Sequence, residues 1–287
     1  MAAGVSRAGP AGPKNNEAPL PGGLRVMLQA YARRGSRVTE VVVPGLTHRS
    51  PLPPAVRLGS WVFSSVIGGD DLKTNTLPAE PAEQIEQAFQ NVKTVMKAAG
   101  GDVEGVNHLW VFLADMAHQS TMLNAYLRMF PEEGDRPARK TVHYKLPPGC
   151  YIQVQIAGDI GGRQGNFEAP GVGHQDPIPM GSRAGGLLIS SGVHGMDAKT
   201  SKMTPDGIVA ETGITFDNLK TLMKVAGGTL EDIAGLTVLI RDYAHVPIVR
   251  AILESHYGAA GLPAIQFANY DLPSILNVQF HVVAARL

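Results

Sequence analysis

The sequence lacks the cysteines that disulfides and thiolate metal sites require. Its single cysteine, Cys150, can form no internal disulfide, and no C-x-x-C pair exists, which fits a reducing compartment. Neither sign of charge prevails, since 25 Lys and Arg stand against 25 Asp and Glu, and no basic run supplies a local field for a nucleic acid. Long apolar runs are also absent: residues 1–24 carry Pro and Gly where a signal peptide needs an unbroken apolar stretch, and no later stretch reaches the roughly 20 apolar residues of a membrane span. We therefore expect a cytoplasmic protein without nucleic-acid or membrane partners.

Motifs that hold metals or nucleotides are missing as well. There are nine histidines, but no H-E-x-x-H, no H-x-H and no carboxylate-histidine cluster at ligand spacing. The glycines of S-V-I-G-G-D-D and A-A-G-G-D do not have the spacing of a P-loop or a dinucleotide fingerprint. We expect neither a metal nor an organic cofactor.

The chain contains a tandem repeat, because its two halves align with an offset of 126 or 127 residues. F-Q-N-V-K-T-V-M-K-A-A-G-G at 89–101 lies over F-D-N-L-K-T-L-M-K-V-A-G-G at 216–228, and 45–66 and 136–155 have matching segments later in the chain. The alignment predicts a Pro/Gly-rich tail over 1–40, a first module over 41–161, a linker over 162–170 and a second module over 171–287.

Each module has the pattern of an α+β unit. Ile85, Phe89, Val92 and Met96 have the spacing of an amphipathic helix that ends at a glycine pair. A second helix follows in each module, and β-type runs lie between and after the helices. The predicted order is strand-strand, helix, strand, helix, strand, strand.

The last strand of each module has one apolar and one polar face. In the first module Ile152, Val154 and Ile156 alternate with polar residues that include Gln153, and the second module places Gln279 in the same way. If the helices cover the apolar face, the polar face meets either solvent or a polar interface with another module or subunit.

An ordered set of motifs resembles the RidA/YjgF family. The set comprises a serine pair after an early strand, Q-x-x-Q-A-F-x-N-V-K, A-G-G, V-F-L-x-D-M, N-A-Y-x-x-x-F, P-A-R and L-P-x-G, here Ser64-Ser65, Gln84 to Lys93, Ala99 to Gly101, Val111 to Met116, Asn124 to Phe130, Pro137 to Arg139 and Leu146 to Gly149. The resemblance implies, for each module, a six-stranded mixed sheet backed by two helices, a fold also described as chorismate mutase-like. It also implies trimers with ligand clefts between neighbouring modules, and hydrolysis of reactive enamines and imines without a cofactor.

The same resemblance assigns Arg139 of P-A-R to the substrate carboxylate, a role that suits the planar guanidinium. Ile265 stands at the equivalent place of the second module. Further substrate-binding candidates at positions that the resemblance marks are Asn124, Thr141, Ser65, Ser191 and Gly192. Thr141 stands where the family commonly has cysteine, and packing between helices is the alternative role for Asn124.

Some positions depart from the family pattern. The last strand often carries a glutamate that orients water, whereas Gln153 and Gln279 are amides, which can hold a water molecule but cannot take its proton. We therefore expect His48 or His174, in matched proline-containing segments, to move protons or contact the substrate. Loop-anchoring hydrogen bonds are the alternative role for both histidines.

The leading functional hypothesis is hydrolytic deamination of a small enamine or imine that carries a carboxylate, such as 2-iminopropanoate. The H-x-x-P-I/L-P segments resemble the aminomuconate deaminase branch of the family, which makes a 2-aminomuconate-like acid the first specific substrate to test. Hydrolysis or isomerisation of another unsaturated acid, or a ligand-sensing module without catalysis, remain alternatives. Since a ring needs three modules and the chain supplies two, we expect a homotrimer of six modules.

Overall fold

A computed structural model describes residues 30–46, 52–200, 202–203, 207–258, 261–272 and 275–285. These residues form two compact units that divide between Gly165 and Asn166. His48 lies outside the described residues. Within them, no helix combines the length and the apolar character needed to cross a membrane.

The first unit is built on a mixed sheet in the order β1-β2-β3-β7-β5-β6. Only β5 and β6 among these neighbours run parallel, and the short strand β4 pairs with β7 beside the main path. The strands are β1 (Val38–Val41), β2 (Ala55–Leu58), β3 (Trp61–Ser64), β4 (Ile67–Gly68), β5 (Val106–Leu113), β6 (Ala138–His143) and β7 (Ile152–Asp159).

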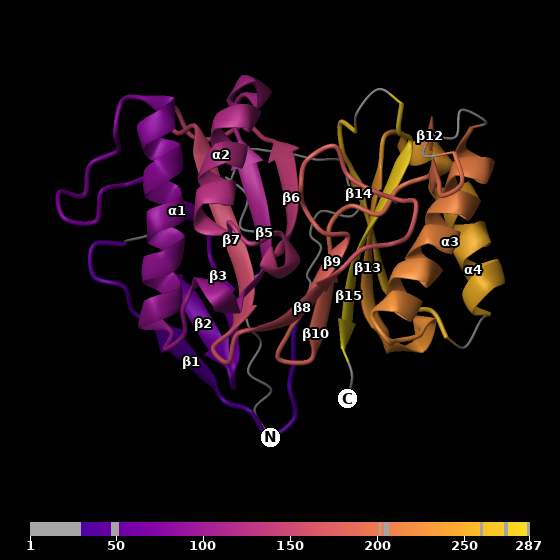
Figure 1. The fold of residues 1–287 in the computed structure, drawn as a ribbon, viewed down its shortest axis with the longest axis horizontal. Coiled ribbons are helices and arrows are strands. Elements are labelled where there is room, and N and C mark those ends of the chain that lie inside the picture. Colours follow the sequence, from indigo (N-terminus) through magenta and orange to yellow (C-terminus); the bar gives the residue numbers. More distant parts are fainter. Residues whose placement is uncertain are drawn as a thin grey trace. The chain divides into compact units, whose positions relative to one another are not determined.

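Helices α1 (Pro81–Ala98) and α2 (Gln119–Met129) pack on one face of this sheet (Figure 1). The predicted apolar stripe of α1 is confirmed, because Ile85, Phe89 and Val92 are buried against the sheet. The helix ends before Gly100, which has a φ of 91° that favours glycine. Short 3-10 turns complete the unit: η2 (Val103–Gly105), η3 (Met116–His118) and η4 (Glu133–Asp135).

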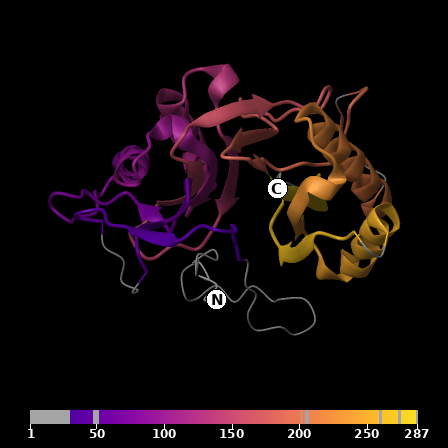
Figure 2. The ribbon, with the colours of Figure 1, turned by 90° about the horizontal axis from the view of Figure 1, so that it is seen from below.

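The second unit repeats this order with a six-stranded sheet, β8-β9-β10-β15-β13-β14. Helices α3 (Ile208–Val225) and α4 (Val246–Tyr257) pack against each other on one side of its strands (Figure 2). The remaining elements are β8 (Arg163–Phe167), β9 (Gly181–Ala184), β10 (Leu187–Ser190), β11 (Met196–Asp197), β12 (Lys202–Met203), η5 (Leu230–Asp232), β13 (Ile233–Ile240), η6 (Tyr243–His245), β14 (Ala264–Asn269) and β15 (Val278–Ala285). The α+β fold with two six-stranded mixed sheets, each with two helices, is confirmed.

One strand in each unit differs from the order predicted by residue pattern alone. β1 begins within the predicted tail, and β8 lies within the predicted linker at the outer edge of the second sheet. Both are edge strands, and the first three residues of β1 are exposed. Because neither strand buries an alternating apolar face, the period-two signal that marks an inner strand is absent.

Matched polar contacts show that the repeat is structural. The hydroxyl of Ser64 accepts a hydrogen bond from the backbone N–H of Ile156 at 2.8 Å, and Ser190 accepts one from Val282 at 2.8 Å. Both serines are buried, so each supplies an acceptor where the backbone would otherwise leave a donor unpaired. The alignment of the two halves therefore holds at the level of single hydrogen bonds.

Candidate functional site

Arg139 lies on β6 with its side chain turned toward helix α2, and only 1% of the residue is exposed. Nη1 of the guanidinium donates to the sulfur of Met122 at 2.9 Å. Its central carbon lies 4.8 Å from the ring centroid of Tyr126. These two groups are neutral, and a thioether is a weak acceptor. A carboxylate that reached the same guanidinium would form a much stronger, charge-assisted contact.

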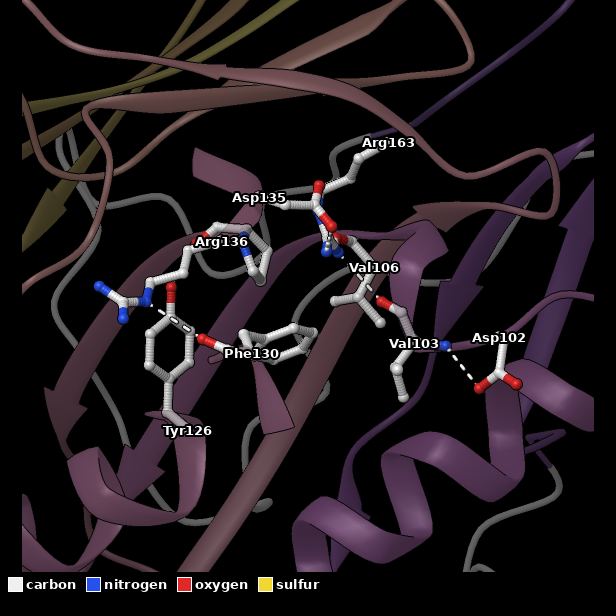
Figure 3. A network of polar contacts seen from close by, with 9 residues as sticks. Asp102, Val103, Val106, Tyr126, Phe130, Asp135, Arg136 and Arg163 are labelled. Carbon is white, nitrogen blue, oxygen red and sulfur yellow. Dashed lines mark hydrogen bonds and ion pairs between the residues drawn. The ribbon is translucent and has the colours of Figure 1, made fainter. Parts of the chain in front are cut away.

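The segment that leads into β6 forms hydrogen bonds with residues at the end of α2 (Figure 3). The hydroxyl of Tyr126 donates to the carbonyl of Pro137 at 2.8 Å, and Nε of Arg136 donates to the carbonyl of Phe130 at 3.1 Å. Tyr126 therefore fixes the start of the P-A-R segment and also supplies the ring under Arg139. The motif N-A-Y contained this tyrosine, but its spacing gave no sign of either role.

Arg163 fixes the loop before Arg136 from the other side (Figure 3). Its guanidinium donates to Asp135 at 2.9 and 3.1 Å and to the carbonyls of Val103 and Val106 at 3.0 and 2.6 Å. The Arg163 side chain is 2% exposed and lies 5.3 Å from the ring centroid of Phe130. A permanently charged group with several acceptors holds this loop rigidly.

Thr141 joins Arg139, whereas Asn124 does not. Thr141 lies two residues farther along β6 and thus on the same face, and its buried hydroxyl has no hydrogen-bond partner among the described residues. Asn124 is exposed on α2, whose buried residues include Met122, Ala125 and Tyr126. Of these two predicted ligand contacts, the fold brings only Thr141 beside the arginine.

Strand register identifies Ile265 as the counterpart of Arg139. Arg139 pairs with Leu109 across β5 and β6, and Ile265 pairs with Leu236 across β13 and β14. Leu109 and Leu236 occupy equivalent places in the two sheets, opposite Ile156 and Val282. Ile265 packs against the apolar core, so this position of the second unit offers no group that could bind an anion.

The predicted serines are engaged by their own loops. The hydroxyl of Ser65 donates to the carbonyl of Pro53 at 2.7 Å, and that of Ser191 donates to Pro179 at 2.7 Å. Their backbone N–H groups donate to Pro54 and Met180 in the same hairpins. These contacts secure the strand before the loop and engage the hydroxyl and backbone donors of both serines.

Gly192 and Gln279 fit together in the second unit. A Cβ on residue 192 would lie 2.0 Å from Nε2 of Gln279, so the glutamine side chain occupies the space that glycine leaves open. Gln279 is 5% exposed. The first unit has Val66 at the equivalent place, so Gln153 cannot pack in the same way.

His174 lies close to a second histidine that the sequence reasoning missed. The rings of His174 and His194 are 5.5 Å apart at their centroids and meet at 83°. His194 follows the segment of Ser191 and Gly192, and the fold therefore brings His174, His194, Gly192 and Gln279 into one region of the second unit. The alignment of the two halves could have drawn attention to His194, because the first module has a glycine, Gly68, at the equivalent position.

Gln153 lies on β7, half-buried, on the face away from the helices. That face also carries Lys140, which pairs with Trp110 in the register of β5 and β6. Burial lowers the pKa of Lys140 from 10.5 to about 8, because a low-polarity environment penalises the charged ammonium.

Gln84 and Glu211 hold the starts of the last strands. Gln84 on α1 donates to the carbonyls of Pro78 and Gly149 and accepts from the N–H of Tyr151, with distances of 2.7 to 2.9 Å. Glu211 on α3 instead accepts from three donors, namely both nitrogens of Asn277 and the N–H of Val278, at 2.8 to 3.0 Å. Both side chains are 1% exposed. Gln84 meets both carbonyls and an N–H group, which an amide can satisfy, whereas Glu211 meets only donors, which suit a carboxylate.

Within the described residues, no group of three or more His, Cys, Asp or Glu side chains could hold a metal ion. The described residues offer a cation at Arg139, hydrogen bonding at the amide groups, and hydrogen bonding or proton transfer at the imidazole groups.

Comparison with known proteins supports a family assignment. The family model described as Endoribonuclease L-PSP matches residues 46–158 and 179–283, that is, both units. The 2-iminobutanoate/2-iminopropanoate deaminase of Escherichia coli K12 is 31% identical over 107 residues, which cover 37% of this chain and 84% of that protein. Reactive Intermediate Deaminase A of Arabidopsis thaliana is also 31% identical over 107 residues, but the match covers 56% of its length.

Among solved structures, RidA from an Antarctic Psychrobacter is 26% identical, with 42% of this chain and 100% of that chain covered and a TM-score of 0.40. The family model spans well over half of the sequence in two consecutive matches. This chain belongs to the Endoribonuclease L-PSP family, which includes the RidA/YjgF proteins.

Proposed function

We propose that this protein hydrolyses a small imine or enamine that carries a carboxylate and releases ammonia. The observation that supports this most is Arg139, which the fold buries between a thioether and an aromatic ring on a tightly held strand. The name of the Escherichia coli relative, a deaminase of 2-imino acids, supports the same chemistry.

In this proposal Arg139 fixes the substrate carboxylate, and the hydroxyl of Thr141 donates a further hydrogen bond. Gln153 lies on the face of its sheet opposite to Arg139, so the water is held by Gln153 or Gln279 of a neighbouring chain in the expected trimer. This water adds its oxygen to the C=N carbon, and His174 or His48 takes a proton from it. The same proton then goes to the nitrogen, which gives a carbinolamine. As the C–N bond breaks, the carbinolamine hydroxyl gives up its proton, the nitrogen takes a proton, and a 2-oxo acid and ammonia leave. The substrate carboxylate is the alternative proton carrier.

Ammonia release from freshly generated 2-iminopropanoate tests this function, with 2-aminomuconate as the second substrate. We expect catalysis of at least one, above the spontaneous rate, which is measured in parallel because such imines hydrolyse in water. Binding of 2-oxobutanoate without any catalysed release of ammonia would instead favour a ligand-sensing module.

We also propose that the protein assembles as a homotrimer of six modules. Each chain supplies two modules, and a closed ring takes three. Three chains therefore supply six modules, enough to close two rings with none left over. Light scattering should then report about 91 kDa, three times the 30.4 kDa of one chain. A stable monomer at micromolar concentration would contradict the assembly while leaving the chemistry to its own test.

A further inference from the structure

The backbone at His194 is held by the same contacts as the backbone at the equivalent glycine of the first unit. The side-chain amide of Asn218 donates to the carbonyls of His194 and Met196 at 2.8 and 2.7 Å. In the first unit Asn91 donates to the carbonyls of Gly68 and Asp70 at 2.9 and 2.8 Å. The same backbone path is therefore held in the same way around a glycine, and the imidazole is an addition specific to the second unit.

The added imidazole lies where predicted functional groups meet. Val193 exchanges two backbone hydrogen bonds of 2.8 Å with Phe280, which places the segment of His194 alongside β15. The neighbouring Gly192 receives the side chain of Gln279. His194 is 6% exposed, and its ring meets that of His174 nearly edge to face.

Two imidazoles in this geometry favour the state in which one ring is cationic and the other is neutral. A cationic ring is attracted to the electron-rich face of a neutral aromatic partner. Two cationic rings at a centroid distance of 5.5 Å repel each other. The pair therefore takes up a first proton readily and resists a second, as coupled titrating groups do.

We propose that His194 is a positioning residue for His174, and that the two rings act as one proton-transfer pair in imine hydrolysis. His194 holds the His174 ring in orientation and stabilises its protonated form after it has taken the proton of the attacking water. This inference rests on the proposed function for its role in catalysis, whereas the pairing of the rings stands on the geometry.

Other ionisable groups lie on the elements around the pair. Asp176 is on the segment of His174, and His281 is on β15, two residues beyond Gln279. Glu211 on α3 accepts from the backbone N–H groups of Asn277 and Val278, and Asp197 on β11 accepts from those of Lys199 and Thr200. Backbone hydrogen bonds from Thr200 and then Lys199 are the main cause that lowers the pKa of Asp197.

The variant His194→Gly tests the pairing, since Gly68 shows that this backbone accepts glycine. We expect kcat to fall about tenfold and KM to change less than about twofold, a smaller loss than the hundredfold or more that removal of the proton carrier itself causes. The acid limb of the pH–rate profile should lie at a pH lower by about half to one unit in the variant than in the wild type. The double variant with His174→Asn should lose no more activity than His174→Asn alone.

His118→Asn is the matched control, because its ring also meets one aromatic ring, Tyr151, at 5.6 Å and 80°. The control should keep both kcat and the acid limb of the wild type. An unchanged acid limb in His194→Gly overturns the proposal, whether kcat falls or not, because a purely structural role would lower the rate without moving the limb.

A second measurement separates this inference from the proposed function. The ring-proton NMR signal of His174, assigned by its loss in His174→Asn, is followed against pH in the wild type and in His194→Gly. A titration midpoint that moves to lower pH in the variant supports the pairing even if no imine proves to be a substrate. A midpoint that does not move overturns the pairing even if the enzyme is an active deaminase.

Discussion

Replacing Arg139 with methionine would remove the guanidinium while keeping an apolar side chain against Met122 and Tyr126. If Arg139 binds the substrate carboxylate, kcat/KM should fall about 30- to 1000-fold, which corresponds to about 2–4 kcal/mol of transition-state stabilisation. Arg139→Ala should lose at least as much activity, but it also leaves a cavity beside the ring. Methionine is therefore the cleaner substitution.

The expected magnitude follows from what the guanidinium contacts. Nη1 lies 2.9 Å from the sulfur of Met122, and the ring centroid of Tyr126 is 4.8 Å from the central carbon. Hydrogen bonds to charged groups contribute about 1.5–3 kcal/mol each, and a bidentate carboxylate makes two of them. Desolvation of the carboxylate and loss of the sulfur contact offset part of this gain, which leaves about 2–4 kcal/mol.

Two other arginines serve as controls in the same ammonia-release assay. Arg57 donates to the carbonyl of Ala99 at 3.1 Å, and Arg183 donates to that of Ala226, at the ends of α1 and α3. Their alanine variants should lose about 1 kcal/mol of stability, as for a helix-end hydrogen bond, and keep kcat/KM. The reasoning is refuted if Arg139→Met keeps the wild-type kcat/KM, or if Arg57→Ala loses as much as Arg139→Met.

Three further predictions concern stability, each measured by urea unfolding. The folded chain releases the Lys140 proton near pH 8 and the unfolded chain near 10.5, so the free energy of unfolding should rise between these values by up to about 3 kcal/mol, and Lys140→Met should abolish the rise. Glu211→Gln and Gln84→Glu should each lower the free energy of unfolding by about 1–3 kcal/mol, because the first places a donor against donors and the second places acceptors against carbonyls. If neither variant changes the stability, the match between these side chains and their partners is contradicted. Arg163→Ala should lower the free energy of unfolding by about 2–4 kcal/mol, since it leaves two carbonyls without a donor. Asp135→Ala should lower it by under about 1 kcal/mol, since that carboxylate is 49% exposed. A larger loss in Asp135→Ala than in Arg163→Ala would contradict the network.

The fold could be predicted from the sequence because its signals are periodic and occur twice. The residues that alternate along β7 and those spaced as a helix on α1 are the residues that the structure buries. The edge strands β1 and β8 escaped the residue pattern because they have little apolar surface to bury. Their pairing depends on hydrogen bonds to a neighbour, which a local pattern does not encode.

The candidate site was only partly predictable. Arg139 was found through its motif, but the sulfur of Met122 beneath it depends on how α2 packs on β6. His174 was found through the repeat, whereas its neighbour His194 is on a separate loop and meets it only in the folded chain. Ser65 was found through its motif, but the hydrogen bond from its hydroxyl to the carbonyl of Pro53 is visible only in the folded chain. Side-chain direction is set by packing, so motif position alone cannot supply it.

Equivalent positions of the two units fall into a retained set, which carries the same residue in both units, and a diverged set, which carries different residues. The retained residues hold backbone: Asn91 and Asn218 bind the same carbonyls of their loops, and Ser64 and Ser190 bind the same strand donors. Losing any of them would leave buried backbone groups unpaired. The diverged set includes Arg139 against Ile265 and His194 against Gly68. Because the backbone is secured independently, these positions could change in one unit without unfolding it. Functional asymmetry between the units should therefore be sought at such positions, which include Arg139 and His194.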